Sequence, residues 1–434
     1  MNRISNISSI GNPDVLARKL LLWAQQYEEV VFLESNAPNQ YERQPYGSFD
    51  LLLAVGAQFS IETGYREAFE KLRDFQNTHN DYIFGYLGYD LKNDVEELSS
   101  RNEDHLEFSD LYFFIPQKLF VLRGNELEQL YLKDLTMQME IDLTEIYRCE
   151  SVETTSSNNP SISPRINREA YFEKVGHILD HIHRGDIYEV NFCQEFYADN
   201  AVLDPVAVYH KLNDISRAPF SSYLKLSDRY LLSASPERFV KKIKNKVIVQ
   251  PIKGTARRID DQEEDVLLAK SLANDPKERA ENIMIVDLIR NDLSKHAQKG
   301  SVDVEELCKV YSFKQVHQLI STVVCETSAD VQPVDILKDL FPMGSMTGAP
   351  KISAMKIIEE EEETKRGLYS GAVGYFTPSG DFDFSVVIRS ILYNRAARYA
   401  SISVGSAITA MSVIENEYEE CLLKAKALKQ ALSS

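Results

Sequence analysis

One lysine stands where it can act as a nucleophile. Lys253 follows a strand-like pattern at residues 246–252 and precedes the pair Gly254-Thr255. The alternation of that segment predicts a strand, so we expect Lys253 where the strand opens into a loop. Apolar neighbours disfavour the charged form of a lysine and lower its pKa, which would supply the neutral amine that nucleophilic catalysis needs. The alternative interpretation is a surface lysine at a strand end.

Four glutamates form two pairs on predicted helices. Asp275 and Pro276 are typical of a helix start and predict a helix at 277–293, and residues 415–432 show a second helical pattern. The pairs are Glu278 and Glu281 in the first helix and Glu417 and Glu420 in the second. Side chains three residues apart share a helix face, so facing pairs would form an oxygen-rich cage for which Mg²⁺ is the natural ion. Two solvated helix faces are the alternative.

Seven blocks follow one another from about residue 167 to the C-terminus. They are GDIYEVN at 185–191, SASPERF at 233–239, QPIKGT at 250–255, IVDLIRNDL at 285–293, MGSMTGAPK at 343–351, SGAVGY at 370–375 and VIRS at 387–390. This order resembles the chorismate-utilising enzymes, the family of the anthranilate, aminodeoxychorismate, isochorismate and salicylate synthases. Weaker echoes occur at 32–35 and 85–90. The resemblance implies an α/β (α+β) sandwich, with two large, mainly antiparallel sheets packed together and helices outside.

Within this family, the residue at Lys253 separates the branches. Anthranilate synthases generally carry Pro-Ile-Ala-Gly-Thr, whereas aminodeoxychorismate synthases carry Pro-Ile-Lys-Gly-Thr, as this sequence does. The resemblance implies that Lys253 attacks C2 of chorismate and expels the C4 hydroxyl, and that ammonia then displaces the lysine by attacking C4. Glu237 matches the family's general acid; a salt bridge with Arg238 is the alternative. The product would be 4-amino-4-deoxychorismate, on the route to 4-aminobenzoate and folate.

The resemblance also assigns the residues that would hold the substrate and the metal. Magnesium bound by the two glutamate pairs, directly or through water, would neutralise the ring carboxylate, with Glu281 and Glu420 as the main ligands. The other expected residues are Arg389 and Tyr375 at the enolpyruvyl carboxylate, the backbone of Gly405, Ser406 and Ala407 as further donors, Ser345, Thr347, Gly254 and Thr255 in the pocket wall, and the catalytic His317 beside the ring. Without the family, His317 would be taken as a core histidine with satisfied hydrogen bonds.

Three departures from the family pattern limit these expectations. Glu189 occupies a place where the aminating branches usually have Gln and the water-adding branches have a lysine base. The missing lysine argues against isochorismate or salicylate synthesis, and the role of Glu189 stays open. Ala407 replaces a usual glycine, so the carboxylate-binding turn would accept only negative φ there. Ser345 and Thr347 exchange the commoner Thr and Ser, which keeps a hydroxyl at each place.

Composition narrows the function class. The 434 residues carry a formal net charge of −18 and are 44% hydrophobic, which suits a large core but not a nucleic-acid binder. We expect a cytoplasmic enzyme, because neither a signal peptide nor an apolar run of about 20 residues is evident. The five cysteines are scattered and predict neither a disulfide framework nor a zinc site. None lies in a Gly-x-Cys-x-Gly setting, so the resemblance implies a separate glutamine amidotransferase subunit as the ammonia source.

The chain divides into three expected segments. Residues 1–150 look like the amino-terminal region of the two aminating branches, residues 151–166 form a Ser- and Pro-rich exposed linker, and residues 167–434 form the chorismate-binding catalytic region. Later segments at 188–196, 372–377, 384–392 and 399–404 are strand-like. Two other functions remain open: anthranilate synthase component I, and a non-catalytic subunit of the same fold.

Overall fold

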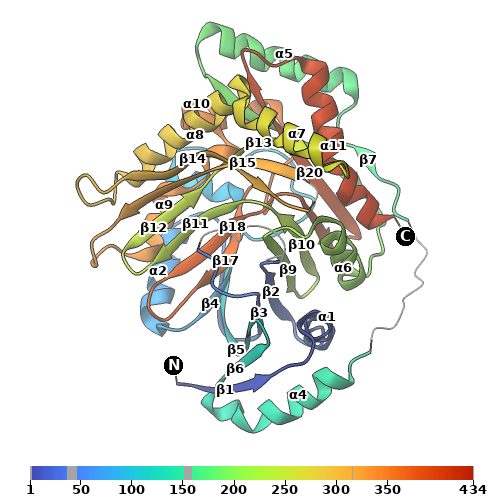
Figure 1. Ribbon diagram of the computed structural model, residues 1–434, viewed down its shortest axis with the longest axis vertical. Helices are drawn as coiled ribbons and strands as arrows, with labels where there is room; N and C mark the ends of the chain where they lie inside the picture. Colours follow the sequence, from blue (N-terminus) through green and yellow to red (C-terminus); the bar gives the residue numbers. More distant parts are fainter. Residues whose placement is uncertain (1, 37–45, 151–158, 315, 434) are drawn as a thin grey trace.

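Two antiparallel sheets share a pair of long strands. The computed structural model describes residues 2–36, 46–150, 159–314 and 316–433. Strands β3 (Leu51–Thr63) and β5 (Leu111–Arg123) pair along their whole length, with a bulge between Ala57 and Phe59. The first half of β5 pairs with β4 (Ile83–Leu87) and the second half with β6 (Glu126–Leu132). The bulge therefore lies where the chain passes from one sheet to the other, and the expected two-sheet sandwich is confirmed (Figure 1).

Each sheet continues outward from β3 and β5. The first sheet runs β1 (Arg3–Ser9), β6, β5, β3, β2 (Glu29–Glu34), β9 (Phe220–Leu226), β10 (Arg229–Ser235), β19 (Ser390–Asn394), β20 (Tyr399–Thr409) and β8 (Glu189–Ala198), with short β7 (Ser163–Pro164) and β16 (Gly348–Ala349) on β8. The second runs β5, β4, β17 (Ala372–Phe376), β18 (Phe382–Val386), β11 (Arg238–Ile243), β12 (Lys246–Gln250) and β15 (Val316–Glu326), with β13 (Ile252–Arg257) following β12 along β15 and β14 (Asp303–Ser312) on the other edge.

The amino-terminal region contributes strands to both sheets. Strand β2 pairs with β9 and β4 pairs with β17, so residues before and after the predicted linker share one pair of sheets. Most of that linker, residues 151–158, lies outside the described residues, and its end forms β7 against β8.

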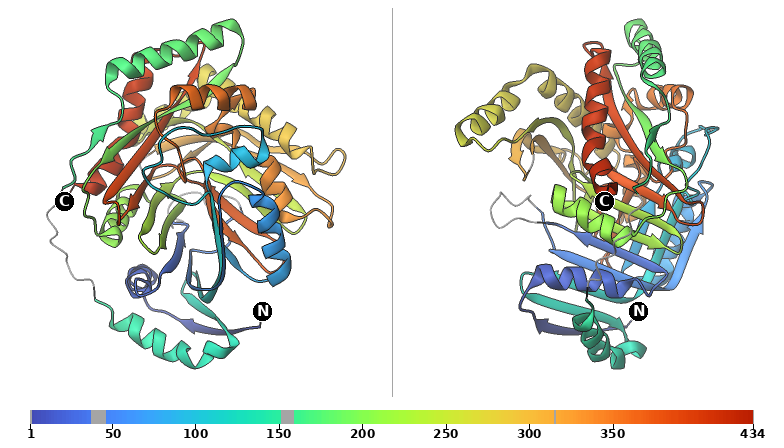
Figure 2. Two further views of the ribbon diagram at one scale, coloured as in Figure 1. Left: turned by 180° about the vertical axis from the view of Figure 1, so that it is seen from behind. Right: turned by 90° about the vertical axis from the view of Figure 1, so that its right-hand side faces the viewer.

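The helices cover the outer faces of the sheets. They are α1 (Pro13–Ala24), α2 (Ala68–His79), α3 (Lys92–Val95), α4 (Met139–Arg148), α5 (Arg168–Arg184), α6 (Pro205–Ser216), α7 (Gln262–Asn274), α8 (Pro276–Leu293), α9 (Pro333–Leu340), α10 (Lys351–Glu361) and α11 (Ile414–Leu432), with 3₁₀ turns η1 (Tyr89–Leu91), η2 (Lys133–Gln138) and η3 (Gly344–Met346). Figure 2 shows α5 and α11 side by side, and both pack on β20. No helix of the described residues is long and apolar enough to cross a membrane.

Strand β2 shows how the core is built from alternating side chains. Val31 and Leu33 join one buried apolar cluster, which includes strands of both sheets and helices α2, α8 and α9, while Val30 and Phe32 join a second cluster, which includes helices α1, α5, α6 and α11. Both faces are buried, so the strand is a continuous apolar run without polar alternation.

The helix that carries the first glutamate pair begins where the sequence predicts. The side chain of Asp275 accepts hydrogen bonds from the amides of Lys277 and Glu278, and Pro276 occupies the first turn. This cap fixes the start of α8 and therefore the direction in which its glutamates project.

Two strands differ from the sequence prediction. The expected strand at 246–252 is divided at Pro251 into β12 and β13, because proline has no amide hydrogen to donate to the ladder. Lys253 is consequently the second residue of β13, inside a strand and not in a loop. The expected strand at 384–392 is likewise divided into β18 and β19, and Arg389 between them has a φ of 51°.

A buried ion pair ties α10 to the first sheet. Arg366 binds Glu362 at 2.6 Å and donates to the carbonyls of Met346 and Asn191 at 2.7 and 2.8 Å. We expect Arg366→Met to lower the free energy of unfolding by about 3–5 kcal/mol, because Glu362 would remain as a buried, unpaired carboxylate. Urea unfolding measures this loss. Arg290→Met, which removes an exposed ion pair on α8, should cost less than about 1 kcal/mol, and equal losses in both variants would contradict the prediction.

Candidate active site

Lys253 meets a carboxylate from the other sheet. Its Nζ donates to Oε1 of Glu189, the first residue of β8, at 2.5 Å, and the two side chains are only 10% and 1% exposed. Burial acts to lower the pKa of Lys253, but the charge and hydrogen bond of Glu189, together with Glu281 and Glu237, outweigh it. The pKa of Lys253 is therefore raised, which corrects the expectation of a lowered pKa. A buried anion in direct contact with the amine decides the direction of the shift.

Glu237 is a buried carboxyl group immediately before β11. Ser345 Oγ, in the turn before β16, donates to its Oε1 at 2.7 Å. Burial raises the pKa of Glu237 to about 7, against the opposing effects of Ser345, the Lys253 charge and the amide of Ile252. A carboxyl group of this kind is partly protonated near neutral pH and can give a proton to a leaving group.

The alternative assignment of Glu237, a salt bridge with its neighbour, does not form. Arg238 pairs instead with Asp383 at 2.9 Å. Adjacent residues of an extended chain point to opposite faces, so the side chains of Glu237 and Arg238 point in different directions.

The two glutamate pairs approach each other across α8 and α11. Lys277 of α8 lies between them, with its Nζ 3.5 Å from Glu417 Oε1 and 3.9 Å from Glu281 Oε1. Ser406 of β20 donates to Glu417 and lies 3.5 Å from Glu420 Oε2. The predicted convergence of the two helices is therefore present, and it includes Lys277, which directly precedes Glu278 and was not among the predicted site residues.

Burial affects both glutamates of α8. Oε1 of Glu281 is buried and accepts no hydrogen bond from the described residues, and burial raises the pKa of Glu281 to about 7. Burial also raises the pKa of Glu278, whose carboxylate lies 3.0 Å from where a Cβ on Gly254 would stand. Gly254 has a φ of 88°, so a glycine there serves both the backbone conformation and the close approach of Glu278.

These carboxylates fit a hard divalent cation supplemented by water and substrate oxygens. The described residues contain no group of three or more His, Cys, Asp or Glu side chains already arranged around one point. Glu281 Oε1 accepts no hydrogen bond among the described residues, and the ammonium group of Lys277 lies between α8 and α11. Both observations indicate that this place attracts positive charge. Oxygen donors of this kind are those that Mg²⁺ takes, with several waters retained.

Arg389 supplies positive charge on another side of the site. Among the residues that the structure describes, no carboxylate lies within ion-pair distance of its guanidinium. Burial lowers its pKa, and the charges of Tyr369 and Glu420 act in the opposite direction. Arginine stays charged even so, and an unpaired, desolvated guanidinium is suited to bind a carboxylate. The tyrosine close enough to influence Arg389 is Tyr369, which the sequence analysis did not single out.

Tyr375 lines a cavity whose walls do not include Lys253, Glu237 or Arg389. It packs against Phe84 and Phe49, and burial raises its pKa, with Asp383 acting in the same direction. It stands further along β17, away from the Arg389 end of that strand, so the structure does not bring Tyr375 and Arg389 together. Tyr369, in the sequence Leu368-Tyr369-Ser370 just before β17, takes its place as the candidate.

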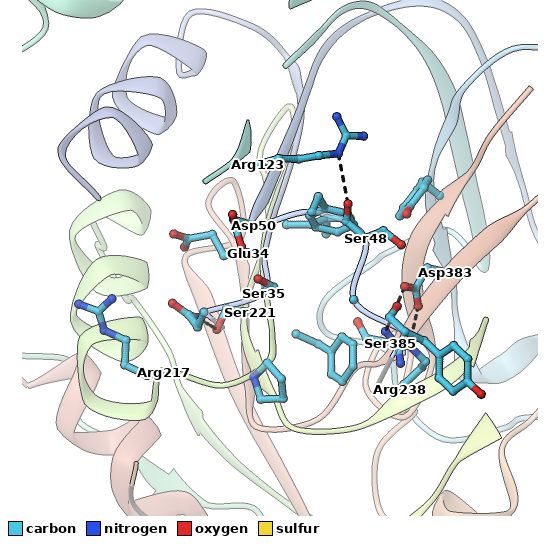
Figure 3. Close-up of a pocket in the computed structure, with 18 of the residues that line it drawn as sticks. Glu34, Ser35, Ser48, Asp50, Arg123, Arg217, Ser221, Arg238, Asp383 and Ser385 are labelled. Carbon is cyan, nitrogen blue, oxygen red and sulfur yellow. Dashed lines mark hydrogen bonds and ion pairs between the residues drawn. The ribbon is translucent and has the colours of Figure 1, made fainter. Parts of the chain in front are cut away.

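The cavity beside Tyr375 has a volume of about 670 Å³ and joins the amino-terminal region to both sheets. Figure 3 labels ten of its residues: Glu34, Ser35, Ser48, Asp50, Arg123, Arg217, Ser221, Arg238, Asp383 and Ser385. The Arg238–Asp383 pair forms one wall, and burial raises the pKa of Glu34 in the opposite wall to about 7. The weak sequence echo at 32–35 therefore contributes to this second cavity, while Glu237 faces Lys253.

His317 is held by two hydrogen bonds. On β15, its Nδ1 bonds with Ser312 Oγ at 2.8 Å and its Nε2 with Asp265 Oδ1 at 3.0 Å, and the residue is 2% exposed. Both ring nitrogens are engaged, which matches the alternative of a core histidine with satisfied hydrogen bonds.

The remaining predicted hydroxyl residues differ in their exposure and in what they contact. Thr347 is fully buried, and its hydroxyl bonds the carbonyls of Met343 and Gly344. Thr255 is exposed on β13. Of this group, Ser345 is the residue that contacts a catalytic candidate.

Residues 405–407 form part of a strand and not a turn. All three pair with β8 in β20, Ala407 opposite Asn191, so the ladder engages backbone groups that were expected to bind a carboxylate. A Cβ at Gly405 would lie 2.3 Å from Asn191 Oδ1, so its glycine serves packing. Ala407 is outside the positive-φ region, in line with the sequence expectation.

Comparison with known proteins places this site in a family. The model of the chorismate binding enzyme family matches residues 29–430. Aminodeoxychorismate synthase component 1 of Klebsiella aerogenes is 37% identical over 350 residues, covering 81% of this chain and 77% of the relative. The protein of the same name from Escherichia coli K12 is 33% identical over 446 aligned positions, covering 94% and 97%. The crystal structure of anthranilate synthase component I from Streptococcus pneumoniae superimposes with a TM-score of 0.79 at 26% identity, covering 90% and 95%. The chain therefore belongs to the chorismate-binding enzymes.

Proposed function

We propose that this chain aminates chorismate at C4 and forms 4-amino-4-deoxychorismate. The observation that carries the proposal is the buried amine of Lys253 in the same site as the acid Glu237, whose pKa is raised to about 7. A lysine at this position supplies a nucleophile, whereas the alanine of the Pro-Ile-Ala-Gly-Thr pattern supplies none. The names of the two relatives with the longest matches given above, both aminodeoxychorismate synthase component 1, support the same assignment.

The proposed reaction has two substitutions. In the first, Lys253 gives up one proton and its neutral Nζ bonds to C2, the ring double bonds shift, and the C4–O bond breaks as Glu237 protonates the departing hydroxyl to give water. In the second, ammonia bonds to C4, the double bonds shift back, the C2–Nζ bond breaks, Lys253 regains its proton, and the proton of the new ammonium group returns to Glu237. A covalent step of this kind divides one difficult substitution into two easier ones.

The substrate is a dicarboxylate in a chain with a net charge of −18, so the site needs local positive charge. Arg389 would bind the enolpyruvyl carboxylate in a planar, bidentate manner, with Tyr369 beside it. Glu281 and Glu420, with Glu278 and Glu417, would hold Mg²⁺, which when bound supplies the charge that neutralises the ring carboxylate.

Removing one ligand should weaken the binding of the metal. We expect Glu281→Gln to raise the magnesium concentration for half-maximal activity by at least about 10-fold, because a buried anionic oxygen becomes a neutral amide. Titration of activity with MgCl₂ measures this change. Glu263→Gln, on the exposed surface of α7, is the matched control and should leave the titration unchanged. Superimposable curves for Glu281→Gln and the wild type would show that Glu281 is not a ligand of the metal.

Ammonia would come from a glutaminase subunit. Burial raises the pKa of all five cysteines, Cys149, Cys193, Cys308, Cys325 and Cys421. A glutaminase nucleophile needs the opposite, a thiol that readily loses its proton. The word component in the relatives' names supports a second chain that performs this step.

The experiment that tests the function is product analysis. Purified protein would be incubated with chorismate, MgCl₂ and an ammonium salt at mildly alkaline pH, and the products separated by chromatography and mass. Aminodeoxychorismate is the expected product. Anthranilate with pyruvate would instead assign the activity named for the Streptococcus pneumoniae structure, and no conversion, even with a glutaminase subunit added, would indicate a non-catalytic role.

A further inference from the structure

The contact between Lys253 and Glu189 joins the two sheets inside the site. Glu189 begins β8 of the first sheet, and Lys253 lies in β13 of the second. Their 2.5 Å contact is almost fully removed from solvent. The proton between them is thus shielded from water, so its transfer would have to occur within the site.

The main chain of Glu189 is fixed on two sides. It pairs with Thr409 of β20 and with Ala349 of β16. A Cβ on Gly348 would lie 2.1 Å from the Glu189 carbonyl oxygen, so the two backbones are in the closest packing that glycine permits. The carboxylate therefore leaves a rigid strand end and cannot retreat from Lys253 without disturbing both partners.

The two carboxylate oxygens of Glu189 differ in their contacts. Oε1 accepts from Lys253, while Oε2 is buried and has no hydrogen-bond partner among the described residues. A buried oxygen of this kind is costly to leave unsatisfied. It gives Glu189 the capacity to hold a proton without losing its contact with Lys253.

We propose that Glu189 is the positioning residue that takes the proton of Lys253 as the amine attacks the substrate and returns it when the amine leaves. The inference rests on the proposed covalent role of Lys253. One Nζ–H proton passes to Glu189, the Nζ–C2 bond forms, the C4–O bond breaks, and Glu237 supplies the proton that converts the hydroxyl to water. After ammonia bonds to C4 and the C2–Nζ bond breaks, the proton on Glu189 restores the ammonium form of Lys253.

Other charged groups also face this pair. Glu237 and Glu281 raise the pKa of Lys253, and Glu278 and Glu420 interact with its charge from α8 and α11. Glu237 is committed to the leaving hydroxyl, and none of the four is within ion-pair distance of Lys253 in the described part of the chain. Glu189 is the acceptor already in contact.

The experiment follows the first chemical step without ammonia. Wild type, Glu189→Gln and Lys253→Ala would be mixed with chorismate and MgCl₂ from about pH 6 to about pH 8.5 and quenched. Intact-protein mass spectrometry would measure the fraction of protein that carries the adduct. With Glu189 present, no proton needs to leave for solvent, so we expect the wild-type rate of adduct formation to be level from about pH 6 to about pH 7 and to fall above that as Glu237 ionises. Glu189→Gln should be at least about 10-fold slower at the lowest pH and should rise up to about pH 7, because Lys253 must first lose its proton to water. Above about pH 7 its rate should level off, because the ionisation of Glu237 offsets the gain in neutral lysine.

Two further variants separate proton transfer from simple packing. Glu189→Asp keeps a carboxylate and should restore part of the level profile. Glu195→Gln changes another buried glutamate of β8, paired with Arg165, and should retain the wild-type profile. A Glu189→Gln profile that matches the wild type, or a variant that is faster throughout, would overturn the inference. An absence of adduct in the wild type would contradict the proposed covalent step instead.

Discussion

Lys253→Ala is expected to lower the rate of aminodeoxychorismate formation by about 10³-fold or more. The variant removes the only group proposed to bond to the substrate, and loss of a nucleophile typically has effects of this size or larger. It also recreates the Pro-Ile-Ala-Gly-Thr pattern, so residual turnover should shift toward anthranilate and pyruvate. Chromatography of the products measures both changes in one assay.

Lys246→Ala is the matched control for this variant. Lys246 lies on the neighbouring strand β12 and pairs with Glu305 at 2.5 Å, so its loss removes a lysine and an ion pair without reaching the site. We expect its product and rate to match the wild type. Unchanged aminodeoxychorismate formation in Lys253→Ala would show that C4 amination proceeds by direct attack of ammonia.

Glu237→Gln is expected to reduce kcat by about 10²–10⁴-fold, the usual contribution of a general acid. In the wild type the active form is the protonated acid, and its pKa is about 7. The rate should therefore be highest below that pH and fall about tenfold per pH unit above it, whereas the residual rate of Glu237→Gln should lack this fall. The pH dependence of kcat, with the concentration of free ammonia held constant, measures the difference.

The hydroxyl of Ser345 offers a finer control on the same prediction. Its hydrogen bond at 2.7 Å favours the ionised form of Glu237 and so lowers the pKa. Ser345→Ala should raise that pKa and move the fall in rate to higher pH. A shift to lower pH, or a falling limb that survives in Glu237→Gln, would assign the ionisation to another group.

Much of the architecture was accessible from the sequence because local signals coincide with it. Asp275 and Pro276 start α8 as predicted, and the spacing of the two glutamate pairs brings them together across α8 and α11. The ordered motifs predicted the two-sheet fold. The places where strands stop were less accessible, because Pro251 and the positive φ of Arg389 break runs whose apolar pattern continues.

The electrostatic state of the site could not be read in the same way. Apolar neighbours around Lys253 suggested a lowered pKa, but the decisive partner, Glu189, is 64 positions away and arrives from the other sheet. The surroundings of His317 were equally hidden from the sequence: Ser312 and Asp265 engage both of its ring nitrogens, and only the fold brings Asp265 to it. Tyr375 and Tyr369 both lie near β17, and which one approaches Arg389 depends on where that strand begins.

The most direct test of the central claim is to trap the covalent adduct. Wild-type protein would be mixed with chorismate and MgCl₂ without ammonia, quenched, digested and mapped by mass spectrometry. We expect the mass of chorismate less one water on the peptide that contains Lys253, and its disappearance when ammonia is added before the quench. An unmodified Lys253 peptide in protein that still converts chorismate and ammonia to aminodeoxychorismate would contradict the account.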